Sequence, residues 1–494
     1  MRDLYLNSLP SRKEVNQKGK WIIILTLFAF LGIFLRDIIV ARFFGINADL
    51  DSLFLALAIP TFFINVLTQS YGQAVLPPFQ NIHAQCENSE RQIFVSESLT
   101  FILFVLFTLS FAIFFFPDFW LTLFLGDRAA LDIKNLSYYL QFSLPILILG
   151  GITILGNSLL NAIGKSKHSA GAQIILSFGT ILFLFPLLPR MGISGVILSM
   201  IIGQVLNLFI VFCFCSKEGY YLWTLKIPTP SFFKRILSEY IHLSLSAIAS
   251  AMMLPFLQFL ASRLQEGSVG ALTLGNKLTL FATHIASLTM NFVLLPYFSQ
   301  LMIRKSKEEA FKELRYYLIY GTFFSVIFSI IIFLLTPFLI GLFLLGGKLS
   351  IQDSEKVSLV MRFGVLQIPF FIIFFLIQKY ATAQKKSFPV FISSLVALLA
   401  TLLWGGFLSP KFGLAALAST LPVSSFAGSI CLICFLAQQK DINREALVII
   451  FSFLAFFLLI VSFCFFHFYF SAIFFIFLFL LLFKLSHRNE GTVK

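Results

Sequence analysis

The residues most able to do chemistry in this chain are ionisable side chains inside long apolar segments. Arg36 and Asp37 lie in one apolar run, and Asn276 and Lys277 lie in another. Charged groups inside a membrane are costly, so they usually face a cavity or a partner. A guanidinium can bind two oxygens of one phosphate group, and an ammonium adds a point charge. Arg36 and Lys277 therefore predict an anion site, for which a diphosphate is a suitable ligand.

Both cations also have simpler explanations. Arg36 can form a structural ion pair with Asp37 or anchor the end of a helix. Lys277 lies near the start of its apolar run, so its ammonium can extend to the membrane surface. The functional interpretation instead places one cation in each half of the chain, so that a cavity can close around a diphosphate.

Other polar residues within the apolar runs are candidates for ion coupling or for lining a path. Glu239 and His242 are three residues apart and share one face of a predicted helix, which suits a coupling-ion or proton site. Interfacial placement is the alternative for both. His284 follows Lys277 by two turns and is either a proton carrier or a hydrogen-bonded interior histidine. Uncharged residues that can line a sugar path, or join helices by hydrogen bonds, are Gln73, Asn157, Asn161, Gln204, Asn207, Gln258 and Asn291.

No enzyme motif is present in the sequence. It contains no Walker A loop, no His-Glu-x-x-His, no Gly-x-Ser-x-Gly and no Rossmann glycine pattern. Cys431 and Cys434 have the spacing of a redox pair, but they lie in an apolar run without polar neighbours. We therefore expect a protein that is not an enzyme and holds no cofactor or metal. Transport would be driven by an ion gradient, the membrane potential or the substrate gradient.

The composition places these residues in a membrane protein. Of the 494 residues, 59% are hydrophobic and 12% are charged, about half the usual soluble share of charge of roughly 25%. The mean hydropathy is +0.93. These values exclude an ordinary cytosolic enzyme, a disordered scaffold and a short disulfide framework. The net charge of +14 is explained by orientation in a membrane with an anionic inner leaflet, and we expect no nucleic-acid partner.

Apolar runs of about 20 residues predict fourteen membrane-spanning helices. The expected spans are 21–43, 51–76, 93–116, 138–160, 169–188, 192–215, 237–260, 269–298, 317–343, 359–381, 388–408, 413–437, 446–465 and 467–485. With both termini in the cytoplasm, and with the span-end residues Arg42, Lys379 and Lys484 counted in the adjoining segments, cytoplasmic segments hold 25 of the 36 Lys and Arg residues and the opposite loops hold 8. The predicted fold class is an all-α polytopic membrane protein.

Short sequence landmarks recur in the second half of the chain. Residues 75–79 resemble 294–298, residues 161–165 resemble 381–385, and residues 192–195 resemble 413–416, at offsets of 219, 220 and 221. An offset of six spans keeps the orientation, so the halves are expected to be parallel six-helix lobes with the substrate site between them. The expected organisation is a cytoplasmic segment at 1–20, an N-lobe at 21–215, a cytoplasmic linker at 216–236, a C-lobe at 237–437, two further helices within 446–485 and a cytoplasmic tail at 486–494.

Two of these segments resemble a known family. Residues 35–45, Leu-Arg-Asp-Ile-Ile-Val-Ala-Arg-Phe-Phe-Gly, followed by Asp51 and Pro60, resemble the first-helix motif of the MurJ/MviN family, and 73–77 resembles the end of its second helix. The resemblance implies fourteen helices in two six-helix lobes with a two-helix extension. It also implies flipping of lipid II, the undecaprenyl-diphosphate-linked peptidoglycan precursor. Arg36, Arg42 and Asp51 match the motif and are expected to act in the substrate site, together with Asp37, Asn276 and Lys277.

Several family positions differ here. An earlier arginine is Phe30, an arginine pair falls at about Ile64-Asn65, the acidic residue after it falls at about Gln69, and an Asp-Arg pair becomes Asn276-Lys277. Relative to the family, these differences predict a substrate site with fewer cations.

The favoured function is a flippase that moves lipid II across the bacterial inner membrane by alternating access. The first alternative is a flippase for another lipid-linked oligosaccharide, of the O-antigen or exopolysaccharide type. The resemblance also implies membership of the superfamily of multidrug, oligosaccharidyl-lipid and polysaccharide exporters. A cation-coupled multidrug antiporter of that superfamily is disfavoured by two extra spans and scarce deep carboxylates. A structural membrane protein and a membrane-embedded transferase using Asp49 and Asp51 are further alternatives. Expected partners are the lipid-linked glycan, membrane lipids and the cell-wall synthesis machinery.

Overall fold

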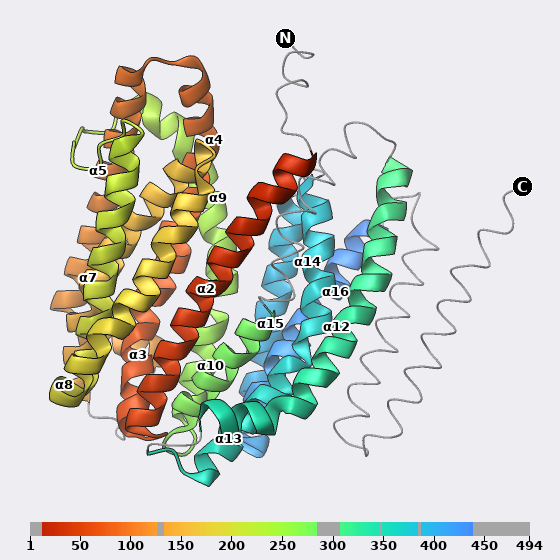
Figure 1. Ribbon diagram of the computed structural model, residues 1–494. Helices are drawn as coiled ribbons and strands as arrows, with labels where there is room; N and C mark the ends of the chain where they lie inside the picture. Colours follow the sequence, from red (N-terminus) through yellow and green to blue (C-terminus); the bar gives the residue numbers. More distant parts are fainter. Residues whose placement is uncertain (1–11, 126–132, 284–306, 345–347, 384–386, 438–494) are drawn as a thin grey trace, which may run out of the picture. The chain divides into compact units, whose positions relative to one another are not determined.

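The computed structural model describes residues 12–125, 133–283, 307–344, 348–383 and 387–437, and its named elements are all helices (Figure 1). In chain order they are α2 (Arg12–Phe44), α3 (Ala48–Phe63), the π-helix η1 (Ile64–Thr68), α4 (Gln69–Gln85), α5 (Asn88–Phe115), α6 (Pro117–Leu125), α7 (Ile133–Ala162), α8 (Ser166–Lys217), α9 (Pro230–Ala251), α10 (Met253–Ser262), α12 (Lys307–Phe343), α13 (Ile351–Val365), α14 (Gln367–Ala383), α15 (Ser387–Phe412) and α16 (Leu414–Ala437). Residues 268–283 are also helical. The expected all-α fold class is confirmed.

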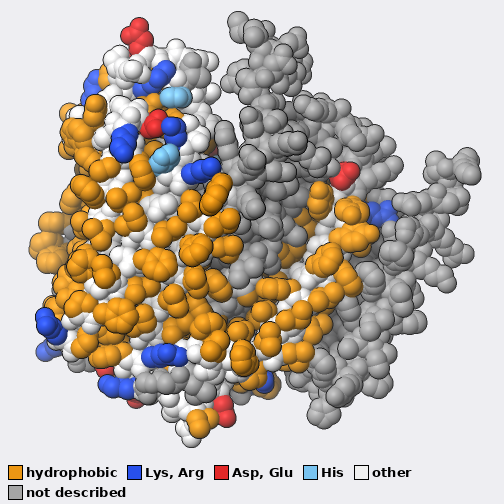
Figure 2. All heavy atoms as spheres, in the orientation of Figure 1, with side chains coloured by type: hydrophobic (Ala, Val, Ile, Leu, Met, Phe, Trp, Pro, Cys, Tyr) orange, Lys and Arg blue, Asp and Glu red, His pale blue; other side chains and the backbone are white. Residues whose placement is uncertain are grey.

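Ten helical segments among the described residues are long and apolar enough to cross a membrane. One of them, α8, is 52 residues long and covers two predicted spans, with non-helical backbone at Gly192. Hydrophobic side chains cover the middle of the visible face, and charged side chains gather towards its two ends (Figure 2). The chain is therefore a multi-pass membrane protein. The expected spans at 446–465 and 467–485 and the end of the eighth span lie outside the described residues, so the count of fourteen stays a prediction.

The chain forms two compact units. The first comprises 1–292, 334–364 and 401–420, and the second comprises 293–333, 365–400 and 421–494. In the first unit, α9 packs against α4, where the rings of Tyr71 and Tyr240 meet edge to face at 5.3 Å. In the second unit, the Ser329 hydroxyl donates to the Val365 carbonyl at 2.7 Å. The lobe boundaries drawn from the sequence stay a prediction.

Glycines with left-handed backbone mark equivalent points of the internal repeat. Gly192 and Gly413, which belong to one of the repeated landmarks, both have φ of 57°. Gly45 and Gly267, with φ of 78° and 82°, form a further pair at an offset of 222 residues. The sequence comparison did not reveal this pair. Because L side chains rarely adopt this conformation, glycine allows the chain to leave one helix and start the next. The shared geometry supports the repeat.

Candidate functional site

The predicted cations meet at one carboxylate. Arg36 and Asp37 lie on α2, and the Arg36 guanidinium donates from Nη2 and Nε to Asp37 Oδ1 at 2.7 and 3.0 Å. The ammonium of Lys277, on the helix at 268–283, lies 2.9 Å from Asp37 Oδ2. The sequence placed Arg36 and Lys277 in different halves of the chain, and the structure brings them together through Asp37.

Aromatic side chains surround this ion cluster. The Lys277 ammonium lies 4.5 Å from the centre of the Phe54 ring, a cation–π contact. About one turn away on the same two helices, the rings of Phe34 and Phe281 stack with their centres 5.0 Å apart. The ring of Phe343 meets that of Phe34 edge to face at 5.2 Å. The low-dielectric surroundings strengthen the attraction between the charges.

The cluster has an excess of positive charge and is partly open. Two cations share one carboxylate, which leaves one formal positive charge uncompensated. The side chain of Asp37 is 8% exposed and that of Arg36 is 16% exposed, whereas that of Lys277 is 33% exposed. An anion can therefore reach Lys277 more readily than Arg36, and the arrangement favours an anionic ligand.

The side chains of Arg42 and Asp51 form hydrogen bonds with backbone groups. Arg42 Nη2 donates to the Leu342 carbonyl at 3.0 Å, and its own carbonyl accepts from the Lys348 amide at 2.9 Å. Asp51 accepts from the amides of Gly267 and Gly270 at 2.9 and 2.6 Å, which caps the start of the helix at 268–283. These bonds give both side chains a structural role, and their contact with substrate stays a prediction.

A reciprocal contact strengthens the cap. Glu266, just before the helix at 268–283, accepts from the Ala48 amide at the start of α3 at 3.0 Å. Asp51, in the first turn of α3, and Glu266, just before the helix at 268–283, therefore each support the amino terminus of the other helix. Glu266 was not predicted from the sequence, because its partner lies far away along the chain.

The remaining predicted residues are not joined to the cluster by any described contact. Asn276 is buried, and neither polar atom of its carboxamide has a hydrogen-bond partner among the described residues. Glu239 and His242 are exposed on α9, and His242 Nδ1 donates to the Ser238 carbonyl at 2.6 Å. His284 lies outside the described residues. Ion coupling by these residues stays a prediction.

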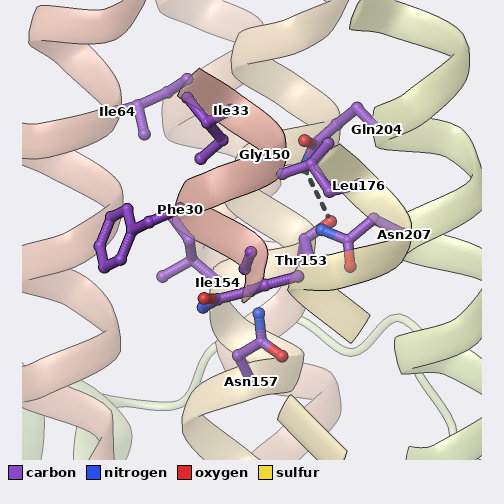
Figure 3. Close-up of a pocket in the computed structure, with 12 residues that line it drawn as sticks. Phe30, Ile33, Ile64, Gly150, Thr153, Ile154, Asn157, Leu176, Gln204 and Asn207 are labelled. Atoms are coloured by element: carbon purple, nitrogen blue, oxygen red, sulfur yellow. Dashed lines mark hydrogen bonds between the residues drawn. The ribbon is translucent and has the colours of Figure 1, made fainter. Parts of the chain in front are cut away.

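A separate, mostly apolar pocket brings together polar residues that the sequence left open between two roles. Asn157, Gln204 and Asn207 lie on its wall with Thr153, between α2, α7 and α8 (Figure 3). Thr153 was not singled out by the sequence, because a lone threonine in an apolar run has no distinguishing pattern.

Long apolar helices, an internal repeat and a buried cationic cluster are the features of a multi-pass membrane transporter. The family described as "Lipid II flippase MurJ" matches residues 40–485. The chain belongs to this family.

Known relatives and solved structures agree with that assignment. A "Probable lipid II flippase MurJ" of Borreliella burgdorferi is 24% identical over 440 residues, covering 87% of this chain and 85% of the relative. A solved structure of "Lipid II flippase MurJ, inward closed conformation" has a TM-score of 0.73 at 19% identity, covering 95% of this chain and 99% of that one. An inward-facing multidrug resistance MATE family transporter of the MOP superfamily has a TM-score of 0.64 at 14% identity, covering 86% and 94%. The two structures show that the fold is shared.

Proposed function

We propose that this protein is a flippase that translocates lipid II across the bacterial inner membrane. Membership of the lipid II flippase MurJ family supports the substrate class. The observation that carries the proposal is the Arg36–Asp37–Lys277 cluster, because lipid II carries a diphosphate and the cluster has an excess positive charge.

The cluster suits a ligand that binds and then leaves. Without substrate, Asp37 compensates one of the two positive charges. A diphosphate can take contacts from Lys277 and Arg36 in place of Asp37, using the two parallel donors of the guanidinium. Asp37 then remains beside both cations and competes with the bound anion, which limits affinity and favours release.

Alternating access accounts for the movement of the head group. Rocking of two repeats about a binding site near the membrane centre is the common mechanism of transporters with internal repeats. The polyprenyl tail would stay in the lipid while the head group crosses. No chemical bond changes in this cycle, so the protein would act as a transporter and not as an enzyme. Both termini would lie in the cytoplasm. Cell-wall synthesis proteins would be its partners.

The test is replacement of the resident flippase in a bacterium. Cells depleted of their own lipid II flippase would receive this protein, and growth and lipid II on the outer face of the membrane would be measured. We expect rescue by the wild type and loss of rescue with Arg36→Ala at equal membrane abundance. Arg190→Ala, an exposed arginine on α8, is the matched control and should rescue. Normal flipping by Arg36→Ala would contradict the proposed site.

A further inference from the structure

The pocket between α2, α7 and α8 is uncharged, and five of its twelve lining residues carry a hydrogen-bonding side chain. Its volume is about 200 Å³, and none of the twelve residues that line it is Asp, Glu, Lys, Arg or His. Its polar wall is formed by Thr153, Asn157, Gln173, Gln204 and Asn207, of which all but Gln173 are labelled in Figure 3. All of these residues belong to the same compact unit as the cation cluster.

Two oxygens of this wall lack partners. The Oδ1 atoms of Asn157 and Asn207 are buried and accept no hydrogen bond from the residues that the structure describes. Asn207 is buried, with 2% of its surface exposed. Buried polar atoms are almost always hydrogen-bonded, so two unpartnered oxygens on residues that line one cavity point to a missing donor.

A third carboxamide is held in place beside them. Gln204 Nε2 donates to Thr153 Oγ1 at 3.1 Å, and Thr153 Oγ1 donates in turn to the Leu149 carbonyl at 2.7 Å. The hydroxyl proton of Thr153 is thereby used, so its oxygen acts as an acceptor for Gln204. This chain of bonds fixes the Gln204 side chain at the pocket wall.

The chemistry of the wall favours an uncharged ligand with hydroxyl or amide groups. A carboxamide offers donors and an acceptor together, and so do the hydroxyl and amide groups of a sugar. A cation is disfavoured because no carboxylate lines the pocket and an uncompensated charge at this depth is costly. The volume is below the roughly 300 Å³ of sites for drug-sized ligands, so the pocket suits one ring-sized group.

The pocket and the cation cluster share one face of α2. Phe30 and Ile33 line the pocket, and Asp37 follows Ile33 by four residues, about one turn. The seven residues from Phe30 to Asp37 correspond to about 10 Å along the helix axis. A ligand lying along α2 can therefore contact both sites at once.

We infer that this pocket binds an uncharged sugar of the substrate head group while Arg36 and Lys277 contact its diphosphate. The inference rests on the proposed function and assigns the sugar to Asn157, Gln204 and Asn207. It separates two parts of recognition, a charged part at the cluster and a neutral part at the pocket.

The test compares two lipids that differ in the sugar. Purified full-length protein in nanodiscs would be titrated with lipid II and with undecaprenyl diphosphate, which has the tail and diphosphate but no sugar. Asn207→Leu and Asn157→Leu remove polar groups from α8 and α7 and keep the number of side-chain heavy atoms and the branching at Cγ. Each should weaken lipid II binding about ten-fold, as expected for a lost hydrogen bond, and leave undecaprenyl diphosphate binding unchanged.

A matched control exists in the same unit. Gln258 Nε2 donates to Thr273 Oγ1 at 3.1 Å, the same type of buried bond, but neither residue lines the pocket. Gln258→Leu should therefore leave the ratio of the two affinities unchanged. Thermal unfolding of each variant shows whether it is folded, and variants on two helices keep the test available if one fails to fold.

The outcomes distinguish the inference from the proposed function. Equal weakening of both lipids in the folded variants, or no change in either lipid, would overturn the sugar site. Wild-type protein that binds lipid II while the pocket variants bind it equally well would leave the flippase proposal standing without this site. Wild-type protein that binds neither lipid would instead contradict the proposed function and the inference together.

Discussion

The Lys277 ammonium and the Asp37 carboxylate lie 2.9 Å apart and join α2 to the helix at 268–283. The same carboxylate accepts two hydrogen bonds from Arg36, so one anion holds two cations. Removing the carboxylate therefore affects the rest of the cluster differently from removing one of the two cations.

Asp37→Asn should destabilise the protein more than Lys277→Gln. The first change leaves two cations without their carboxylate, which costs about 3–5 kcal/mol for a buried pair, whereas the second leaves Arg36 paired with Asp37. The loss of unfolding free energy in the double variant should be smaller than the sum of the two single losses by about 1–3 kcal/mol. Thermal unfolding of the purified variants measures this coupling, and strictly additive losses would show that Asp37 and Lys277 do not interact.

Asp51→Ala should loosen the start of the helix at 268–283. It removes the acceptor for two backbone amides, those of Gly267 and Gly270, at a cost on the order of 1–3 kcal/mol. Faster amide hydrogen exchange at these two residues, measured by mass spectrometry, is the expected result. Asp49→Ala is the matched control, because Asp49 is exposed in the same first turn of α3. Equal exchange in both variants would contradict the capping role.

Gly275→Ala should impair flipping by displacing the helix that carries Lys277. A Cβ at Gly275 would lie 2.5 Å from Val360 Cγ1 and 2.6 Å from Val360 Cβ, closer than atoms can approach. Val360→Ala would keep the clashing Cβ, whereas Val360→Gly removes both atoms, so Val360→Gly in the same protein should partly restore flipping. Measuring lipid II flipping in the single and double variants tests this, and failure of the second change to restore activity would place the cause elsewhere.

The long apolar spans and the repeat were predictable because hydropathy and short landmarks are local properties. Periodic apolar runs predicted most described helices, and the glycine at 192 and 413 marked the same helix break in each half. The meeting of Arg36 with Lys277 through Asp37 was not predictable, since it depends on which faces of two distant helices pack together. The capping role of Asp51 was not predictable either, because the amides that it accepts from, those of Gly267 and Gly270, lie far away along the chain.

Gly192→Ala should destabilise the protein through backbone conformation alone. A Cβ there would meet no atom within 4 Å, but φ is +57°, which costs an L residue about 1–2 kcal/mol. Gly171→Ala, also on α8 and with no atom within 4 Å of the added Cβ, should be neutral or stabilising by up to about 1 kcal/mol. Unfolding midpoints of the two variants distinguish these effects, and equal midpoints would show that Gly192 can adopt an ordinary helical conformation.

The most direct test of the account is lipid II flipping by the wild type and by Arg36→Ala in cells depleted of their own flippase. We predict that the wild type restores growth and brings lipid II to the outer face, and that Arg36→Ala, present in the membrane at the same level, does neither. Absence of lipid II on the outer face despite abundant wild-type protein would contradict the assignment of lipid II as the substrate.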